Sequence, residues 1–445
     1  MKDRRQDTSP AGVAVRPQQA GEVRARWAWA EPAVWTERML TALETGANGG
    51  IWFRLIDKVE SPRVLWAAWA KVWANRGSGG VDGQTVQQFA RDAKSRLSEL
   101  SAALRAGSYQ PLPVRRVYIP KPDGRQRPLG IPAVRDRVVQ TALRNVLEPI
   151  FESQFCEHSY GFRPGRGAKD ALRRVDGQLK EGYRYVVDAD LKSYFDTIPH
   201  ERLMGLVSRR IADGRVLSLV RSYLRQGVME GLSEWKPTGG TPQGAVISPL
   251  LANIYLHPLD SLMRNQGYEM TRYADDFVVL CRTGQEAQAA LAAIQHWVQE
   301  MGLTLHPEKT RIVDTHAPGG FDFLGYHFER GQRTPRQSSL KKFKDAIRVK
   351  TRRTSGQSFL TIVGEVNATT RGWYGYFKHS RGWVFRRLDT WIRGRLRTIL
   401  RRRQGRRGRA RGEDHHRWPN AFFTARGLFS MARAHMLERQ LIYHY

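Results

Sequence analysis

The stretch RYADDFVVL, residues 272–280, decides the fold class, because a tight acidic turn separates two runs that favour β-strands. These runs are residues 269–273 and residues 277–281, both rich in β-branched and aromatic side chains. They predict a hairpin whose tip carries Asp275 and Asp276. A solvated turn would explain a Tyr-X-Asp-Asp tetrapeptide equally well, so the tetrapeptide alone does not decide the chemistry.

A second predicted strand supplies further carboxylates. In residues 185–191 (YVVDADL), Asp188 and Asp190 lie two positions apart and therefore share one face of the strand. If this strand lies beside the hairpin, Asp190 converges with Asp275 and Asp276, an arrangement that is repulsive unless divalent cations lie between the carboxylates. Hard carboxylate oxygens suit Mg²⁺, and two such ions about 3.5–4 Å apart serve nucleotidyl transfer.

Strands and helices alternate in the rest of the sequence. Residues 116–120 and 127–131 predict two short strands on either side of the KPDG turn at 121–124. Residues 61–75 carry apolar side chains at helical spacing after a Ser-Pro start, and residues 285–301 predict a helix behind a threonine cap. This mixture of elements predicts an α+β core.

Composition restricts the class of partner. The chain has 445 residues, and 73 Lys and Arg against 42 Asp and Glu give a net charge of +31. A positive field of this size favours a polyanionic partner, nucleic acid before an anionic membrane. Two cysteines are too few for a disulfide framework, and there is neither a run of about 18 apolar residues nor a secretory signal. We therefore expect a cytoplasmic protein that does not bind membranes.

The two ends of the sequence differ from its middle. Residues 1–30 are polar, with five arginines, and predict a poorly ordered basic arm, whereas globular patterning begins near Trp35. From about residue 338 the composition shifts to long basic helices, and residues 386–411 hold 12 arginines and one acid. We interpret these helices as a surface that binds the phosphates of a nucleic-acid backbone; a solvated helical face is the alternative. The segment at 401–416 predicts a flexible linker or loop.

These motifs belong to a longer ordered series. In chain order its pieces are RVYIPKPDGRQRPLGIP (116–132), SYGFRPGRGAKDAL (159–172), VDADLKSYFDTIPH (187–200), GGTPQGAVISPLLANIYL (239–256), RYADDFVVL (272–280), GLTLHPEKT (302–310), FDFLGYHF (321–328) and RGWYGYFKH (371–379). With this order and spacing, the chain resembles the group II intron-encoded reverse transcriptases/maturases from about residue 35 to its end.

The resemblance implies a right-hand polymerase with fingers, palm and thumb. The expected division is a basic N-terminal arm over residues 1–34, reverse transcriptase fingers and palm over 35–337, a helical thumb/maturase (X) domain over 338–403, and a basic linker and DNA-binding region over 404–445. Residues 321–328 would form a primer-gripping hairpin. Many relatives continue into an HNH endonuclease with zinc-binding cysteines, but no cysteine follows Cys281 here, so we expect no endonuclease. The chain thus resembles the bacterial lineage that lacks this domain, for which the priming strand arises otherwise.

The resemblance also implies the ligands of the metal site. Asp190, Asp275 and Asp276 match the family's metal-binding positions, with the carbonyl of Leu191 as an additional ligand. The implied cofactor is a pair of Mg²⁺ ions, for which Mn²⁺ is a possible substitute.

Three further residues near these positions have weaker assignments. Asp188 and Asp196 lie close to the metal-binding pattern but off it, and ion pairing or hydrogen bonding explains them as well. Phe195 matches an aromatic position beneath the incoming sugar, where a bulky ring would clash with a 2′-hydroxyl and favour dNTPs. Without the resemblance, Phe195 would be interpreted as an ordinary core aromatic.

The remaining candidates would bind the nucleotide or the primer-template. Lys121 and Arg127 flank the turn that the family folds over the triphosphate, although a solvated charged turn is the alternative. Gln243, in the TPQG piece, would support the base pair or template. Lys309 would donate a proton to the leaving pyrophosphate, with a surface lysine as the alternative.

We therefore interpret the chain as an RNA-directed DNA polymerase with a two-metal-ion mechanism. The resemblance implies that it binds its parent group II intron RNA, promotes splicing as a maturase, and copies the intron into target DNA during retrohoming. Its partners would be intron RNA, an RNA template, a DNA primer and target DNA, and dNTPs. The resemblance also implies that the protein associates with the bacterial nucleoid when it binds target DNA.

Three alternatives remain open at this point. A domesticated reverse transcriptase of the same type could serve in DNA repair or phage defence without an intron. A non-catalytic RNA-binding splicing factor would use only the basic surface, which the crowded carboxylates argue against. An RNA-dependent RNA polymerase is disfavoured by Phe195.

Overall fold

A four-stranded antiparallel sheet carries the predicted acidic hairpin in the computed structural model, which describes residues 17–120, 124, 126–231 and 233–443. We call it the palm sheet. In spatial order its strands are β6 (Glu269–Tyr273), β7 (Asp276–Cys281), β3 (Tyr185–Asp190) and β8 (Arg311–Asp314). The hairpin and the separate strand that the sequence predicts are confirmed, and they lie side by side because β3 pairs with β7.

Alternate residues of the palm strands belong to two different hydrophobic cores. Val187 and Phe277 pack in the main core, with helices α12 (Ser248–Asn265) and α13 (Gly284–Glu300). Val186 and Val278 pack in a second core, with α8 (Ala168–Lys180). Because side chains alternate along a strand, Asp188 and Asp190 lie on the α8 face of the sheet.

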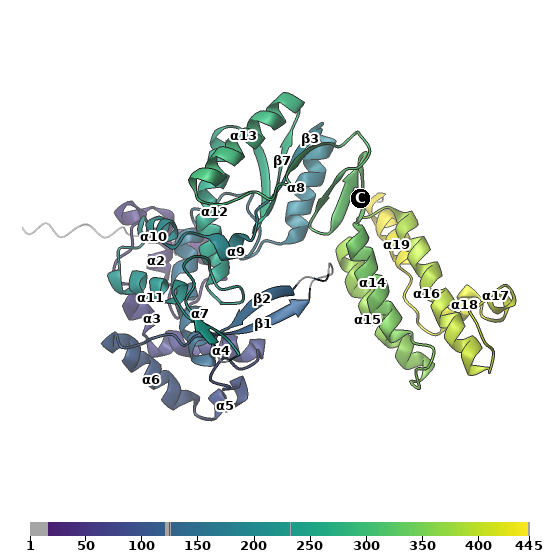
Figure 1. Ribbon diagram of the computed structural model, residues 1–445, viewed down its shortest axis with the longest axis horizontal. Helices are drawn as coiled ribbons and strands as arrows, with labels where there is room; N and C mark the ends of the chain where they lie inside the picture. Colours follow the sequence, from purple (N-terminus) through teal and green to yellow (C-terminus); the bar gives the residue numbers. More distant parts are fainter. Residues whose placement is uncertain (1–16, 121–123, 125, 232, 444–445) are drawn as a thin grey trace, which may run out of the picture.

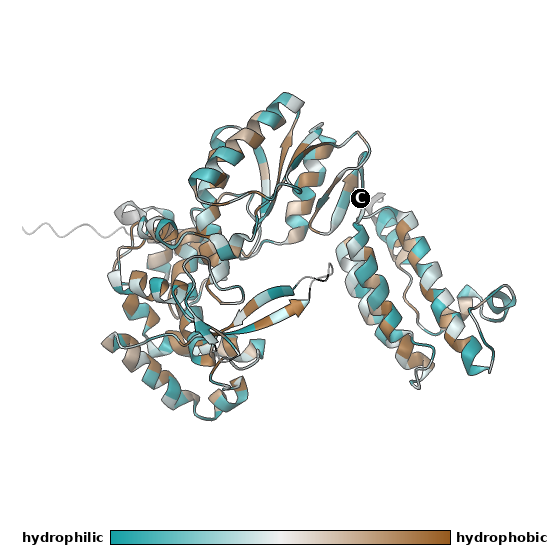
Figure 2. Ribbon diagram, viewed as in Figure 1, coloured by the Kyte–Doolittle hydropathy of each residue, from teal (hydrophilic) through white to brown (hydrophobic). Residues whose placement is uncertain are grey.

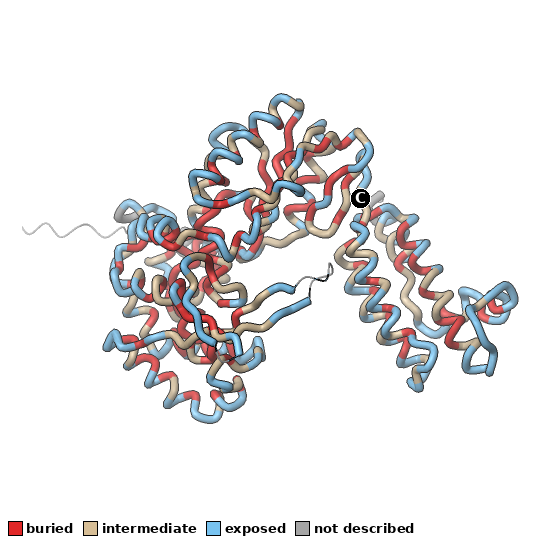
Figure 3. The backbone as a smooth tube through the Cα atoms, in the orientation of Figure 1, coloured by how far each residue is buried: buried red, intermediate tan, exposed pale blue. Residues whose placement is uncertain are grey.

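A second sheet forms the fingers. Its order is β2-β1-β4-β5, with β1 (Val114–Pro120), β2 (Gln126–Ile131), β4 (Val228–Glu230) and β5 (Ser233–Trp235). The predicted hairpin is confirmed as the antiparallel pair β1–β2, and β4 adds to β1 in parallel. The hairpin is buried at its base and exposed toward its outer end, where it projects toward the C-terminal helices (Figures 1 and 3).

Helices surround these sheets and supply most of the main core. The N-terminal ones are α1 (Pro17–Arg26), α2 (Glu37–Glu44), the 3₁₀ helix η1 (Ala47–Gly50), α3 (Ile56–Val59), α4 (Pro62–Asn75), α5 (Val86–Arg91), α6 (Ala93–Ala106) and α7 (Val134–Glu152). The helices between β3 and β4 are α9 (Tyr194–Thr197), α10 (His200–Ser208) and α11 (Gly214–Leu224). Helix α7 is buried along most of its length and packs against α4, which places it behind the fingers hairpin.

A small sheet connects the palm to a helical C-terminal region. The sheet has the order β11-β10-β9, formed by β9 (Phe321–Phe323), β10 (Tyr326–Glu329) and β11 (Gln332–Pro335). The helices are α14 (Gln337–Lys350), α15 (Phe359–Phe377), α16 (Gly382–Arg403), α17 (Glu413–Arg417), α18 (Asn420–Ala425) and α19 (Met431–Tyr443). They share one hydrophobic core, in which Phe385 and Trp418 are buried.

The expected N-terminal arm needs correction over the part that the structure describes. Helix α1 packs against α2, and Val23 and Trp27 are buried in the main core. Trp27 Nε1 also donates a 3.0 Å hydrogen bond to Glu44. The prediction rested on the basic composition of the segment and did not take account of these two apolar residues, which lie four positions apart and thus on one helical face. The first half of the expected arm, residues 1–16, lies outside the described residues.

The expected flexible linker at 401–416 is also ordered in the structure. Asp414 is buried, accepts a 2.9 Å hydrogen bond from Arg401 and caps the backbone N–H of Arg411. Trp418 and Phe423 then pack in the same core as α14, α15 and α16. The expected DNA-binding region thus packs directly on helices α14, α15 and α16, and its role stays a prediction.

The distribution of apolar residues agrees with these cores. Apolar residues, brown in Figure 2, occupy the central palm strands, whereas hydrophilic residues cover much of the outer helical surface. No helix within the described residues is long and apolar enough to cross a membrane.

Candidate active site

Asp190 and Asp276 lie directly opposite each other on β3 and β7. Directly paired residues on antiparallel strands project to the same face, with Cβ atoms about 4.5–5.5 Å apart. Asp188 shares this face and lies opposite Val278. The structure thus brings Asp190 to the acidic tip of the palm hairpin.

An unusual backbone conformation shapes the turn that carries Asp275 and Asp276. Ala274 has a φ of 59°, in the left-handed region that side chains seldom adopt. Gly161 packs against this turn so closely that a Cβ at position 161 would overlap the backbone nitrogen of Ala274. Only glycine therefore allows this close approach.

A buried arginine holds the same turn from inside. Arg272 donates hydrogen bonds to Asp260 (Nε–Oδ1 2.7 Å), to Asn253 (Nη1–Oδ1 2.9 Å) and to the carbonyl oxygen of Ala274 (2.8 Å). Asn253 in turn donates a 2.8 Å hydrogen bond to the carbonyl oxygen of Gly161. Because Arg272 and Asp260 are both buried, each needs the other as a partner. The network fixes the acidic turn to helix α12 and to the Gly161 segment.

Crowded negative charge characterises the site. Desolvation, followed by the charges of Asp275, Asp188 and Asp190, raises the pKa of Asp276 to about 7, although this residue keeps contact with solvent. Desolvation also raises the pKa of Asp275, and the charge of Asp190 adds to this effect whereas Arg127 opposes it. A divalent cation among these carboxylates would relieve the repulsion, so the residues fit such an ion chemically.

Lys309 occupies part of this site. Its Nζ donates a hydrogen bond to Oδ2 of Asp190, and the segment that carries it runs antiparallel to the end of β3. The backbone N–H of His306 donates a 2.7 Å hydrogen bond to the carbonyl oxygen of Asp190, and Leu191 pairs with Leu305. Within the described residues, no group of three or more His, Cys, Asp or Glu side chains is already arranged to hold a metal ion. The metal site, including the carbonyl of Leu191, therefore stays a proposal.

A cleft of about 690 Å³ lies between the fingers sheet and the palm. Its wall includes Arg116 and Tyr118 of β1, Gly130 of β2, and both Phe195 and Gln243 from the palm side. The backbone N–H of Gly130 donates a 2.6 Å hydrogen bond to the carbonyl oxygen of Gln243, which fixes the TPQG loop to the fingers hairpin. The structure thus brings together two residues that the sequence places 48 positions apart on the same cleft.

Phe195 and Gln243 are positioned differently within this cleft. Phe195, on α9, is half-buried, and its ring contacts Tyr194 and Phe162 edge-on, with centroid distances of 5.4 and 6.5 Å. One part of the ring therefore packs in the protein while another lines the cleft. Gln243 Nε2 donates a 3.2 Å hydrogen bond to Oδ2 of Asp196, which orients the glutamine amide.

The two predicted fingers cations have different outcomes. Lys121 lies outside the described residues. Arg127 is exposed on β2, and its charge acts on Asp275 across the site. The fingers hairpin therefore brings positive charge to the acidic turn.

The hairpin expected at 321–328 is formed by β9 and β10. Phe321 and Phe328 stack with centroids 5.0 Å apart, and both are buried together with Tyr326. These aromatic rings pack on one another in a hydrophobic core. The turn of the hairpin faces the active site, because the backbone N–H of Leu324 donates a hydrogen bond to Asp276.

Arginines of helix α16 fall into two groups. Arg386, Arg387, Arg402 and Arg403 are exposed, and among them Arg403 also donates a hydrogen bond to the carbonyl oxygen of Gln357. In contrast, Arg397 is buried and donates to the carbonyl oxygen of Trp418 (2.8 Å). Arg395 and Arg401 also make hydrogen bonds within the domain, the former to Thr351 and the latter to Asp414. The sequence prediction did not separate these structural arginines from those free to contact phosphates.

Arg272, Asp260, Asn253 and Gly161 are the positioning residues that sequence reasoning missed. Arg272 carried a usable signal, because it is a cation inside a predicted strand rather than at a strand end and therefore needs a buried partner. No local pattern identified Asp260 as that partner, which lies 12 residues upstream on another element.

Comparisons with known proteins identify two family regions. Residues 119–328 match the family described as reverse transcriptase (RNA-dependent DNA polymerase), and residues 340–418 match the group II intron, maturase-specific domain. The second match begins three residues inside α14 and continues through α17 to Trp418.

Three relatives illustrate the similarity. Protein YkfC of Escherichia coli is 36% identical over 318 residues, which cover 62% of this chain and 83% of that protein. The group II intron-encoded protein LtrA of Lactococcus lactis is 37% identical over 216 residues, covering 48% of this chain and 35% of that protein. An uncharacterized 91 kDa protein in the cob intron of Schizosaccharomyces pombe is 29% identical over 404 residues, covering 71% and 49% respectively. The chain therefore spans most of YkfC but about a third of LtrA.

Proposed function

The chain belongs to the group II intron-encoded reverse transcriptases and maturases, and on this premise we propose that it is an RNA-directed DNA polymerase that also binds its parent intron RNA and promotes splicing. The observation that carries the polymerase activity is the pairing of Asp190 with Asp276 beside Asp275, next to a cleft lined by Phe195 and Gln243.

The three aspartates would hold the metal cofactor. Asp190, Asp275 and Asp276 would bind two Mg²⁺ ions, or Mn²⁺ in their place, with the Leu191 carbonyl as an additional ligand. Bound ions of this kind activate the primer 3′-hydroxyl and neutralise the leaving pyrophosphate. The raised pKa values of Asp275 and Asp276 support this assignment, because a bound cation would favour the charged carboxylates that burial and neighbouring carboxylates disfavour.

Other residues would bind and orient the nucleotide. The ring of Phe195, fixed edge-on by Tyr194 and Phe162, would exclude a 2′-hydroxyl and so select dNTPs over rNTPs. Arg127, with Lys121, would neutralise the triphosphate from the fingers side. Lys309, held beside Asp190, would donate a proton at the leaving group.

The template and the intron RNA would lie against the fingers and the C-terminal helices. Gln243 would support the nascent base pair, because its amide is oriented by Asp196 and its backbone is fixed to Gly130. The exposed arginines of α16 would bind nucleic-acid phosphates without regard to sequence. We further propose that the protein copies the intron into target DNA by target-primed reverse transcription in retrohoming.

Primer extension on an RNA template in Mg²⁺ tests the polymerase assignment. We expect dNTP incorporation by the wild type and loss of it in the double variant Asp275→Ala, Asp276→Ala, with RNA binding retained because the basic surface is unchanged. A well-folded wild type that binds RNA but makes no cDNA would contradict the proposal and favour a non-catalytic splicing factor. Splicing of the flanking intron RNA, with and without the protein, then tests the maturase role separately from a domesticated polymerase.

A further inference from the structure

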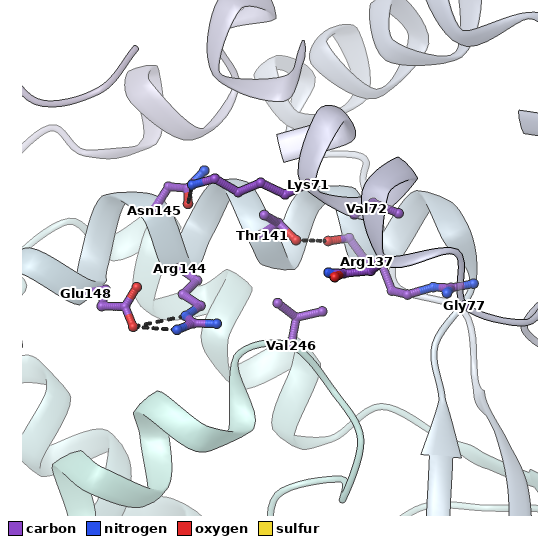
Figure 4. A pocket seen from close by; sticks show the side chains of 10 residues that line it. Lys71, Val72, Gly77, Arg137, Thr141, Arg144, Asn145, Glu148 and Val246 are labelled. Atoms are coloured by element: carbon purple, nitrogen blue, oxygen red, sulfur yellow. Dashed lines mark hydrogen bonds and ion pairs between the residues drawn. The ribbon is translucent and has the colours of Figure 1, made fainter. Parts of the chain in front are cut away.

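A cationic cavity of about 300 Å³ lies between α4 and α7, outside the active-site cleft (Figure 4). Lys71 reaches it from α4, and Arg137 and Arg144 reach it from α7. Glu148 is the acidic side chain among the residues that line it. Arg144 pairs with Glu148 and Lys71 pairs with Glu31, so Arg137 supplies the positive charge that has no ion pair among the described residues. The recess is large enough to enclose part of an anion.

The cations of this cavity are fixed by specific contacts. Lys71 Nζ donates to Oδ1 of Asn145 (2.8 Å) and pairs with Glu31 (2.9 Å). Arg144 binds Glu148 through Nη2 (2.6 Å) and Nε (3.1 Å), which leaves its Nη1 outside that pair. These contacts hold the charges in place before any ligand binds.

Two donors in the cavity wall have no partner among the described residues: the Nε of Arg137 and the Nδ2 of Asn145, whose residue is only 8% exposed. A buried donor without a partner is unfavourable, so an acceptor that reached either atom would be bound favourably. Burial also lowers the pKa of Arg137, and the charge of Asp82 opposes this effect only in part.

The position of the cavity links it to the template side of the fingers. Val246 lines it, only three residues after Gln243, and its backbone N–H donates a 2.8 Å hydrogen bond to Gln140 of α7. The loop after α4 contributes Gly77 to the cavity wall. This loop is fixed to the fingers hairpin, because Arg115 of β1 donates a 2.9 Å hydrogen bond to the carbonyl oxygen of Gly79. The recess therefore adjoins the loop that carries Gln243.

We propose that the cavity between α4 and α7 binds a backbone phosphate of the unpaired template RNA as it approaches the active site. The ligand is a phosphate diester of single-stranded RNA, because the cavity is at the small end of ligand-sized pockets and cannot admit a duplex. The shared chemistry, a phosphate with acceptor oxygens, would also fit inorganic phosphate. This proposal rests on the polymerase function proposed above.

Equilibrium binding of two primer-template duplexes tests this site. One duplex has an unpaired 5′ template extension and the other is blunt. Arg137→Gln removes one cation of the cavity, and Lys71→Gln provides a second variant should the first not fold. Arg91→Gln is the matched control, because it removes the same charge from an exposed position on α5 that does not line the cavity.

We expect Arg137→Gln to weaken binding of the extended duplex about tenfold, as for a lost charge-assisted hydrogen bond, and to leave the blunt duplex almost unchanged. The slope of log affinity against log salt concentration should fall by about 0.7 for the extended duplex, the value for one phosphate of a single strand. Arg91→Gln should affect both duplexes equally.

Neutral methylphosphonate linkages, placed singly along the template extension, identify the phosphate. At one position the linkage should weaken binding by the wild type and have no further effect on Arg137→Gln. The proposal would be overturned if Arg137→Gln weakened binding of both duplexes equally. It would also be overturned if the effects of Arg137→Gln and of the methylphosphonate linkage were additive at every position. Thermal stabilisation of the wild type alone by inorganic phosphate, together with additive effects, would assign the cavity to a free anion and likewise overturn it.

The outcome is separable from that of the polymerase assay. If the wild type makes cDNA normally but Arg137→Gln weakens binding of the extended and blunt duplexes equally, the proposed phosphate site is rejected and the polymerase function is retained. Coupling between Arg137 and one phosphate in a protein that makes no cDNA would support the cavity as an RNA site and reject the polymerase function.

Discussion

Arg272 donates a 2.8 Å hydrogen bond to the carbonyl oxygen of Ala274, two residues ahead, and so holds the left-handed turn from which Asp275 and Asp276 extend. The same guanidinium is paired with buried Asp260. One side chain thus connects the acidic turn to the core of the palm, and the position of the carboxylates depends on an interaction that does not involve them directly.

Replacing Arg272 with lysine should separate positioning from folding. Lysine keeps a cation beside Asp260 but cannot also reach Asn253 and Ala274 with a rigid fork. We expect the extension rate at saturating dNTP to fall about a hundredfold, while primer-template affinity stays within about twofold of the wild type. Arg272→Met, which leaves Asp260 buried and unpaired, should instead destabilise the fold by about 3–5 kcal/mol, measured by urea unfolding. Equal extension rates in Arg272→Lys and wild type would contradict the positioning role.

Gly161→Ala should disturb the acidic turn from the opposite side. The added Cβ would overlap the backbone at Ala274, so the turn must shift and the extension rate should fall by at least tenfold. Gly177→Ala is the matched control, because position 177 lies within helix α8 with nothing within 4 Å of the new Cβ. That control should gain up to about 1 kcal/mol of stability and keep full activity.

Phe195→Val should relax sugar selection. A smaller side chain leaves room for a 2′-hydroxyl, so we expect the preference for dNTP over rNTP in kcat/KM to fall by about two orders of magnitude. Single-nucleotide incorporation with matched dNTP and rNTP measures this ratio. Tyr194→Phe, which removes the 2.6 Å hydrogen bond to the carbonyl oxygen of Ala252, should lower stability without changing the ratio.

Lys309→Met should have opposite effects on cation binding and on chemistry. Because the Lys309 amine is bound to Asp190, its removal frees a carboxylate, and the Mg²⁺ concentration for half-maximal activity should decrease. The maximal rate should nevertheless decrease by about 10²–10⁴-fold if Lys309 is the proton donor. Lys192→Met, an exposed charge near the same strand end, should change neither quantity. An unchanged maximal rate in Lys309→Met would exclude the proton-donor role.

Buried Asp136 should give the fold a measurable pH dependence. Burial raises its pKa from 3.8 to about 6, against the opposing hydrogen bonds from Tyr109 and Leu112. Since the folded pKa lies above the unfolded one, the stabilising contribution is complete below pH 3.8 and is lost as the pH rises through about 6. The shift corresponds to about 3 kcal/mol.

Urea unfolding of Asp136→Asn and wild type at several pH values between these limits measures this contribution. The wild type should lose up to about 3 kcal/mol more than the variant across the range. Asp57→Asn, at an exposed position on α3, should retain the pH dependence of the wild type. Parallel curves for Asp136→Asn and wild type would contradict the assignment.

Local patterns in the sequence predicted the elements of the fold. The valine-rich strand that ends at Asp190, the palm hairpin around its acidic turn and the helix capped by Thr283 depend on periodicity and capping, which neighbouring residues determine. The order of the motifs along the chain identified the family, and the two family matches confirm it. The assignments of individual site residues stay predictions.

Long-range pairing decided the rest. The sequence contains Asp190 and Asp276 but not the register that sets them opposite each other, and it contains Arg272 without its partner Asp260. It also gave no means to tell buried Arg397 from exposed Arg402, because both lie in the same basic helix. The physical reason is that a charge buried by tertiary packing needs a partner brought from another element, and local composition does not specify which element will supply it.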